Sequence, residues 1–163
     1  MKKLAPFIIL LLVAFTADFF RDYIFVNLNY QIHYLSYLDY NYTDSFIENL
    51  VSGHTSRDLH GIKWFFSFLF IFYFYGISFI LIHFQYKEYK RKFHFFLLLL
   101  LFILLLFSSF SYLLSLLVND ISLQYSFYYI SMELSHYLQS SLFFISMIMI
   151  FELYHLFNTP STQ

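Results

Sequence analysis

Residues Phe93–Val118 have the sequence FHFFLLLLLFILLLFSSFSYLLSLLV, in which His94 is the one side chain that titrates near neutral pH. A helix in the core of a soluble protein does not need an apolar surface this long and unbroken. The hydrocarbon core of a bilayer, by contrast, is crossed by about 20 residues of helix. This stretch therefore predicts a membrane span, and the chain is expected to be an integral membrane protein.

The composition of the whole chain agrees with this expectation. Of its 163 residues, 60% are hydrophobic and 12% are charged, whereas a soluble domain has about 25% charged residues. A net charge of −1 argues against binding to nucleic acid. The absence of cysteine excludes disulfides, thiolate metal sites and cysteine nucleophiles. Three glycines and two prolines favour continuous helices over the broken half-helices of many transporters.

The hydropathy pattern predicts a single membrane domain over residues 1–163. Its fold class is an all-α up-and-down bundle of four transmembrane helices, expected over residues 4–20, 57–86, 93–118 and 122–157. The tyrosine-rich segment 21–56 is predicted to be an outer loop. Within it, Ser45 and Glu48 have the spacing of a capping box. A short interfacial helix is therefore expected over residues 46–51, ended by Gly53.

The basic residues predict the orientation of the spans. Six of the nine lysines and arginines lie before the first span or between residues 87 and 92. Such loops face the cytoplasm, so both termini are expected inside and the loop 21–56 outside. The first span also has the length of a secretory signal. Cleavage after Ala17 would leave Phe15 where a small side chain is required, so the sequence favours an uncleaved anchor.

Serines on the last two predicted spans indicate how these helices pack. Lipid is as apolar as leucine, so helix contact in a membrane depends on small residues and on hydrogen bonds between helices. We expect an antiparallel hairpin in which Ser111 and Ser115 lie opposite Ser131 and Ser135, with Ser108 on the same stripe.

Charged residues gather at the predicted outer ends of the spans, where they are expected to form a polar collar. Its members are Asp18, Arg21, Asp22, Arg57, Asp58, Glu133 and His136. One interpretation is structural: ion pairs hold the helices in register, with Asp18, Asp58 and Glu133 as possible partners of Arg21. The other is a wet cavity that acts on a lipid or carrier-linked substrate. Its candidate catalytic residues are Glu133, His136, Arg21 and His60.

Two Glu-x-x-His pairs, Glu133 with His136 and Glu152 with His155, have the spacing of di-iron ligands. Both pairs lie on one predicted helix, 19 residues or about 28 Å apart, which is too far for a shared metal. This distance instead matches the thickness of the hydrocarbon layer, about 30 Å. The pairs are interpreted as markers of the outer and inner boundaries. We predict no metal and no cofactor.

Three short segments support a resemblance. They are Ser56-Arg57-Asp58-Leu59 leading to Lys63-Trp64, the basic turn Lys87–Lys92, and Tyr137-Leu138-Gln139-Ser140-Ser141. With this layout, which covers most of the chain, the protein resembles small four-helix inner-membrane proteins associated with Bacteroidota exosortase-type sorting systems. The resemblance implies an accessory role beside a sorting or envelope-assembly enzyme. It implies no catalytic residues, and without cysteine the chain is not a cysteine transpeptidase.

Three functions follow from these observations. The favoured one is a non-catalytic accessory or assembly subunit of a complex in the bacterial inner membrane. Its expected partners are the lipid bilayer and another integral membrane protein, with no nucleic acid. A small enzyme acting at the outer leaflet is one alternative, and an organelle-encoded subunit of a respiratory complex is another.

Overall fold

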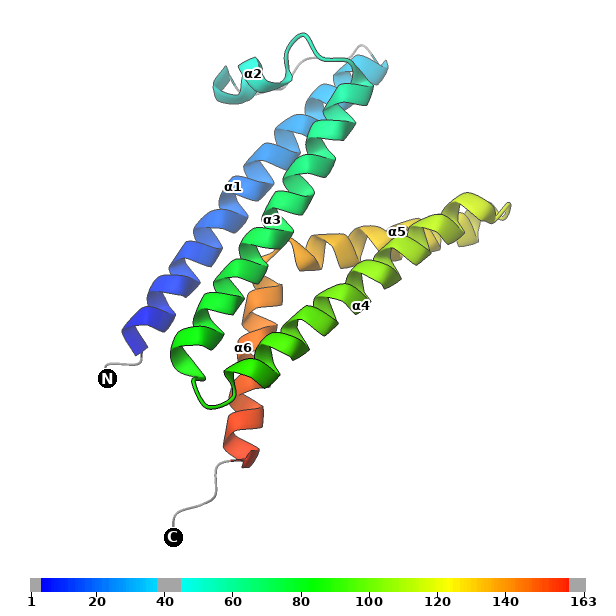
Figure 1. The fold of residues 1–163 in the computed structure, drawn as a ribbon. Coiled ribbons are helices and arrows are strands. Elements are labelled where there is room, and N and C mark those ends of the chain that lie inside the picture. The colour runs from blue at the N-terminus through cyan, green and yellow to red at the C-terminus, as the bar shows by residue number, and fades with distance from the viewer. Residues whose placement is uncertain (1–3, 38–44, 159–163) are drawn as a thin grey trace.

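A computed structural model describes residues 4–37 and 45–158, and this part of the chain consists of helices joined by short turns (Figure 1). The helices are α1 (Leu4–Tyr37), α2 (Ser45–Val51), α3 (Ser56–Gln85), α4 (Lys90–Leu117), α5 (Ile121–Leu138) and α6 (Ser141–Asn158). Helices α1 and α3 run antiparallel side by side. The beginning of α1, the turn between α3 and α4 and the end of α6 lie at one end of the molecule.

Within residues 4–37 and 45–158, two helices, α3 and α4, are long and apolar enough to cross a membrane, and α1, which contains the predicted first span, is not among them. Helices α5 and α6 would together make a third span, but they are bent by 70° at a short break. The predicted helices over residues 57–86 and 93–118 are thus confirmed within a few residues. The prediction of one continuous helix over residues 122–157 is wrong, because the helix breaks at Gln139 and Ser140.

The predicted outer loop is also wrong over residues 21–37, because α1 continues to Tyr37 without interruption. This segment contains neither glycine nor proline, and two of its polar residues, Asn27 and Gln31, are buried. Asn27 is buried and donates a hydrogen bond from Nδ2 to the Tyr23 carbonyl oxygen, 2.8 Å away. Leu28 on the same face is fully buried. Residues 38–44 of the predicted loop lie outside the described residues.

The short helix expected over residues 46–51 is present as α2. Its Ile47 and Val51 are buried against Leu28 of α1 and Leu59 of α3, so α2 covers that end of the α1–α3 pair. Gly53 follows with a φ of +75°, a left-handed conformation that glycine adopts without strain.

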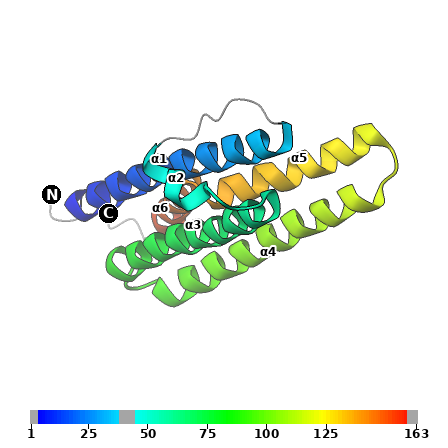
Figure 2. The ribbon, with the colours of Figure 1, turned by 90° about the horizontal axis from the view of Figure 1, so that it is seen from above.

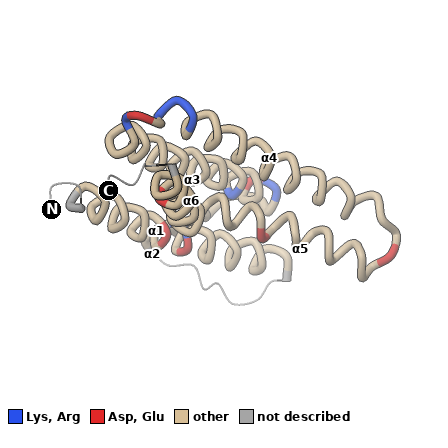
Figure 3. Tube along the Cα trace, turned by 90° about the horizontal axis from the view of Figure 1, so that it is seen from below, with Lys and Arg blue, Asp and Glu red and all other residues tan. Residues whose placement is uncertain are grey.

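Two parts of the molecule differ in how much of their surface is covered. The three-helix body, which we define as α1, α3 and α6, contains most of the large side chains that are fully buried, among them Phe74, Phe143, Phe144 and Phe151. The α4–α5 hairpin extends away from this body (Figures 1 and 2). In the most apolar window of α4, 11% of the residues are buried, compared with 39% for α3. Figure 3 shows α4 without charge between its basic start and the acidic turn before α5.

The two helices of the hairpin pack antiparallel, but in a different register from the predicted one. Ser108 Oγ donates to the Ser131 carbonyl oxygen at 3.0 Å and lies 3.3 Å from its hydroxyl. The predicted pairing of Ser111 with Ser135 is therefore wrong by roughly two helical turns. The reason is the short turn between Leu117 and Ile121, which fixes the register of the hairpin. Ser135 Oγ instead accepts a hydrogen bond from Gln139 Nε2 at 2.7 Å. Ser111 and Ser115 are nevertheless buried.

Candidate functional site at a helix break

The break between α5 and α6 is the most polar buried part of the described structure. Gln139, Ser140 and Ser141 are all buried there. Two backbone hydrogen bonds at this point join residues three positions apart, whereas those of an α-helix join residues four positions apart. The Ser140 N–H donates to the Tyr137 carbonyl at 3.2 Å, and the Phe143 N–H donates to the Ser140 carbonyl at 3.2 Å. The Ser141 N–H and the Gln139 carbonyl therefore need partners from elsewhere.

Asp18 and Arg21 of α1 supply these partners. Asp18 Oδ2 accepts from the Ser141 N–H at 3.0 Å and also from the Ser141 hydroxyl. Arg21 Nη1 donates to the Gln139 carbonyl oxygen at 2.8 Å. The two side chains form an ion pair, with Arg21 Nη1 3.2 Å from Asp18 Oδ1.

The charges of this pair also match the helix ends that they contact. Asp18 lies at the N-terminus of α6, where the helix dipole is positive, and Arg21 lies at the C-terminus of α5, where it is negative. The side chains are shielded, with 21% of Asp18 and 11% of Arg21 exposed. Asp22 accepts from Arg21 Nη2 at 2.6 Å but is 66% exposed. The Asp18–Arg21 pair is thus part of the interior, whereas Asp22 lies at the surface.

Further ionisable side chains come close to the break from two other helices. The charges that act on His136 of α5 are those of Arg21, Glu133, Lys63 and Asp22. Lys63 Nζ of α3 donates to Asn29 Oδ1 of α1 at 2.9 Å. Glu133 and His136 are exposed. We call Asp22, Lys63, Glu133 and His136 the ionisable patch.

The predicted collar is therefore brought together only in part. Asp18, Arg21, Asp22, Glu133 and His136 gather at the break, but Arg57, Asp58 and His60 lie at the start of α3. Because α1 continues for 16 residues after Arg21, the start of the antiparallel α3 is about 24 Å further along the bundle. Of the three carboxylates expected for Arg21, Asp18 is bonded to it. Asp58 instead accepts from Thr55 Oγ1 at 2.6 Å and caps α3.

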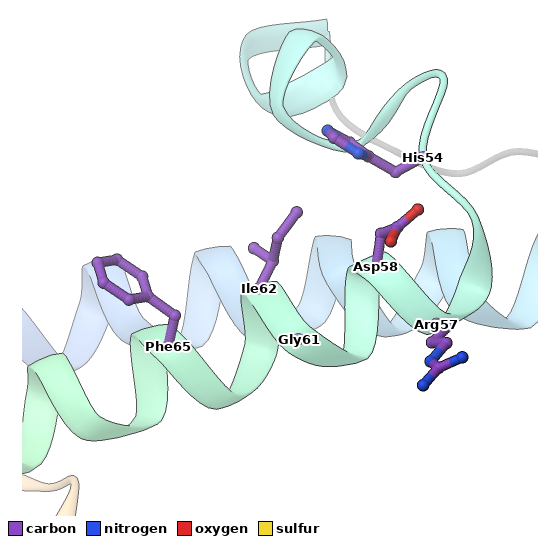
Figure 4. A pocket seen from close by; sticks show the side chains of 6 residues that line it. All are labelled: His54, Arg57, Asp58, Gly61, Ile62 and Phe65. Carbon is purple, nitrogen blue, oxygen red and sulfur yellow. The ribbon is translucent and has the colours of Figure 1, made fainter.

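A shallow, open hollow lies at the start of α3 (Figure 4). The side chains of His54 and Asp58 border the hollow, whereas the side chain of Arg57 points away from it. The remaining lining residues are Gly61, Ile62 and Phe65. His60 is not among them. With the Asp58 carboxylate bonded to Thr55, this hollow does not assemble a nucleophile with a base.

The two Glu-x-x-His pairs are separated by the break, so the straight-helix distance of about 28 Å does not apply to them. Glu152 accepts a hydrogen bond from the buried Tyr86 hydroxyl at 2.6 Å, beside the α3–α4 turn. Phe93 stacks on Phe151 next to this bond, with 4.4 Å between ring centroids. Within the described ranges, no three histidine or acidic side chains come close enough to hold a metal.

Sequence reasoning missed Gln139 and Ser141, the residues to which the Asp18–Arg21 pair is bonded. The available signal was the polar triplet Gln139-Ser140-Ser141 inside an otherwise apolar segment. Sequence reasoning also missed the Tyr86–Glu152 bond, because no local sequence pattern identifies a partner that lies far away along the chain. Comparison of the chain with protein-family models, characterised proteins and solved structures found no match.

Proposed function

We propose that this chain is a non-catalytic accessory or assembly subunit of a membrane complex, in which another integral membrane protein covers the ionisable patch. The observation that carries the proposal is the exposure of Asp22, Glu133 and His136 beside the helix break. Ionisable side chains within a bilayer almost always face protein or trapped water. Exposed ones at this depth therefore need a partner.

Two hydrogen bonds on α6 support the depth that we propose for the patch. Tyr86 is bonded to Glu152, and Asp18 is bonded to Ser141. These points are separated by 11 residues of helix, or about 16 Å. Tyr86 immediately precedes the basic residues 87–92, which fit the headgroup level on the cytoplasmic side. The break is then about halfway across a hydrocarbon layer of about 30 Å.

The charges near the break indicate what the partner contributes. Asp18, Asp22 and Glu133 carry three negative charges, and Arg21 and Lys63 carry two positive ones. With His136 neutral, the group has a net charge of −1. A cationic side chain from the partner would neutralise it, and an ion pair shielded from water is stronger than one at a wet surface.

Arg21 supports a structural role over a catalytic one. Its guanidinium group is bonded to Asp18, Asp22 and the Gln139 carbonyl, so its donors are directed to the fold. Its side chain is 11% exposed. A substrate anion would have to displace contacts that hold α5 and α6 in place. This arrangement favours the accessory role over an enzyme that uses Arg21, Glu133 and His136.

The setting of the proposal is a four-pass protein with both termini in the cytoplasm. In this proposal, α1, which runs beside α3, crosses the membrane with it, and the bent pair of α5 and α6 is taken as one broken crossing. The resemblance to proteins of exosortase-type sorting systems suggests the bacterial inner membrane as the location. Envelope protein sorting is then the process that the complex serves.

A site-specific photo-cross-linker tests the proposal. Placed at His136 in native membranes, it should capture one polypeptide in stoichiometric amount. The same group at Phe102, which is 56% exposed on the uncharged α4, is the control and should capture mainly lipid. Glu133→Ala should reduce recovery of the captured protein in mild detergent while leaving the helix content unchanged. Lipid adducts alone at position 136, with no protein partner recovered, would overturn the proposal.

A further inference from the structure

We infer that the α5–α6 break is a two-state element. The Asp18–Arg21 pair holds it in the bent state, and without that pair residues 121–158 form one continuous helix. The inference concerns the conformation of the chain itself and is independent of which partner covers the ionisable patch.

The local sequence permits a bend at this point, because Ser140 and Ser141 form a serine pair, but it contains no proline that would impose one. Sharp kinks usually occur at proline, at glycine or serine pairs, or where a side chain inserts into the hydrogen-bond ladder. Residues 137–142 contain neither proline nor glycine. The local contribution is from Ser140, whose hydroxyl donates to the Tyr137 carbonyl at 2.8 Å. Serine also occurs in straight helices, so the contacts of Asp18 and Arg21 with Ser141 and Gln139 select the bent state that the serine pair permits.

The Ser141 N–H and the Gln139 carbonyl have partners in both the bent and the straight state. In the bent state the Ser141 N–H donates to Asp18 and the Gln139 carbonyl accepts from Arg21. In a continuous helix the Ser141 N–H would donate to the Tyr137 carbonyl, and the Gln139 carbonyl would accept from the Phe143 N–H. A bilayer does not tolerate unpaired backbone groups. Both states meet that condition for these two groups, and this makes an exchange between them feasible.

The state of the break determines where the α4–α5 hairpin lies. Helix α5 has 18 residues and is about 27 Å long, so removal of a 70° bend would displace its far end by roughly 30 Å. Helix α4 packs along α5 and moves with it. The other joint of the hairpin is the α3–α4 turn beside the Tyr86–Glu152 bond. Two discrete arrangements of packed elements are the usual basis of switching.

The distance between α3 and α5 measures the state directly. The chain contains no cysteine, so Phe72→Cys and Leu123→Cys introduce the only two spin-label sites. Both native side chains are exposed, at 64% and 52%. Double electron–electron resonance in lipid nanodiscs should give one distance population for the parent. The variant Asp18→Ala with Arg21→Met should show a second population, displaced by more than about 10 Å given the length of α5.

The matched control is Asp22→Asn, which removes a charge bonded to Arg21 but leaves both contacts with the break. It should keep the parent distribution. A folded Asp18→Ala/Arg21→Met variant with only the parent distance would overturn the inference.

If that variant does not fold, Ser140→Ala with Ser141→Ala decides the question. It keeps both charges, removes two side-chain bonds at the break and raises helix propensity. A second population supports the two-state element, and the parent distribution alone refutes it.

Discussion

The three-helix body and the α4–α5 hairpin are both apolar, but they differ in how much of their apolar surface is buried within the protein. The body buries Phe74 and Phe143 completely, whereas the hairpin leaves Phe102 and Phe110 more than half exposed. In water the hairpin would aggregate. In lipid the exposure of these side chains costs no free energy, because the acyl chains are as apolar as the side chains. The buried fraction of a side chain therefore shows whether an apolar residue contacts protein or faces lipid, whereas its hydropathy alone does not.

Polar contacts join the body and the hairpin beside apolar ones such as the Phe93–Phe151 stack. The Asp18–Arg21 pair lies at one junction and the Tyr86–Glu152 bond lies near the other. Inside the hairpin, the Ser108–Ser131 hydrogen bond joins α4 to α5. The comparison predicts large effects of substitution in the body and at the junctions, and small effects along the hairpin.

The largest contrast is expected between two phenylalanines. Phe74→Ala removes a fully buried ring from the body and should lower the free energy of unfolding by about 3–5 kcal/mol. Phe102→Ala removes the same atoms from a residue that is 56% exposed on α4, and should cost less than about 1 kcal/mol. Titration with SDS in bicelles measures both. Equal losses would mean that the hairpin is packed as tightly as the body.

Arg21→Met is expected to have the next largest effect. It leaves the Asp18 carboxylate and the Gln139 carbonyl without their cationic partner, and breaking a buried ion pair in this way costs about 3 kcal/mol or more. Asp22→Asn serves as the control. Because Asp22 is 66% exposed, its loss should cost at most about 1 kcal/mol. Similar values in the unfolding titration would show that Arg21 pairs mainly with Asp22.

Tyr86→Phe should have an intermediate effect. The variant keeps the buried ring and removes the hydroxyl that donates to Glu152 at 2.6 Å, a bond to a charged group worth about 1.5–3 kcal/mol. Tyr125→Phe, at a side chain that is 70% exposed on α5, should be neutral. If the two variants unfold at the same SDS fraction, the Tyr86–Glu152 bond does not stabilise the junction.

Ser108→Ala should have the smallest measurable effect. It removes one hydrogen bond between α4 and α5, and such bonds in membranes are worth about 0.6 kcal/mol. Ser109→Ala, at the exposed neighbouring position, should leave the free energy of unfolding unchanged. A loss above about 2 kcal/mol would exceed any value expected for one such bond and would indicate that Ser108 sets the register of the hairpin.

The sequence predicts α3 and α4 well because each is an apolar run with charged residues near its ends, Arg57 and Lys87 for α3 and Lys92 and Asp120 for α4. It does not predict that α1 continues to Tyr37. Polar residues such as Asn27 suggest a loop when seen alone, but Asn27 is buried and bonded within its own helix.

The candidate site was predictable only in its local part. Asp18 and Arg21 are one helical turn apart, so their pairing follows from sequence spacing. Their contacts with Ser141 and Gln139 join residues more than 110 positions apart, and no local pattern specifies them. The break itself depends on these contacts, and this is why the segment has the pattern of one continuous span.

The depth of the helix break in the bilayer is the most direct test of the whole account. A spin label at Leu142, which is 61% exposed in the first turn of α6, can be compared with labels at Trp64 and Lys87. Oxygen and nickel accessibility in lipid vesicles should place the Leu142 label about 15 Å below the headgroups, near the middle of the hydrocarbon layer. A label at Leu142 that is as accessible to nickel as the one at Trp64 or Lys87 would contradict the account.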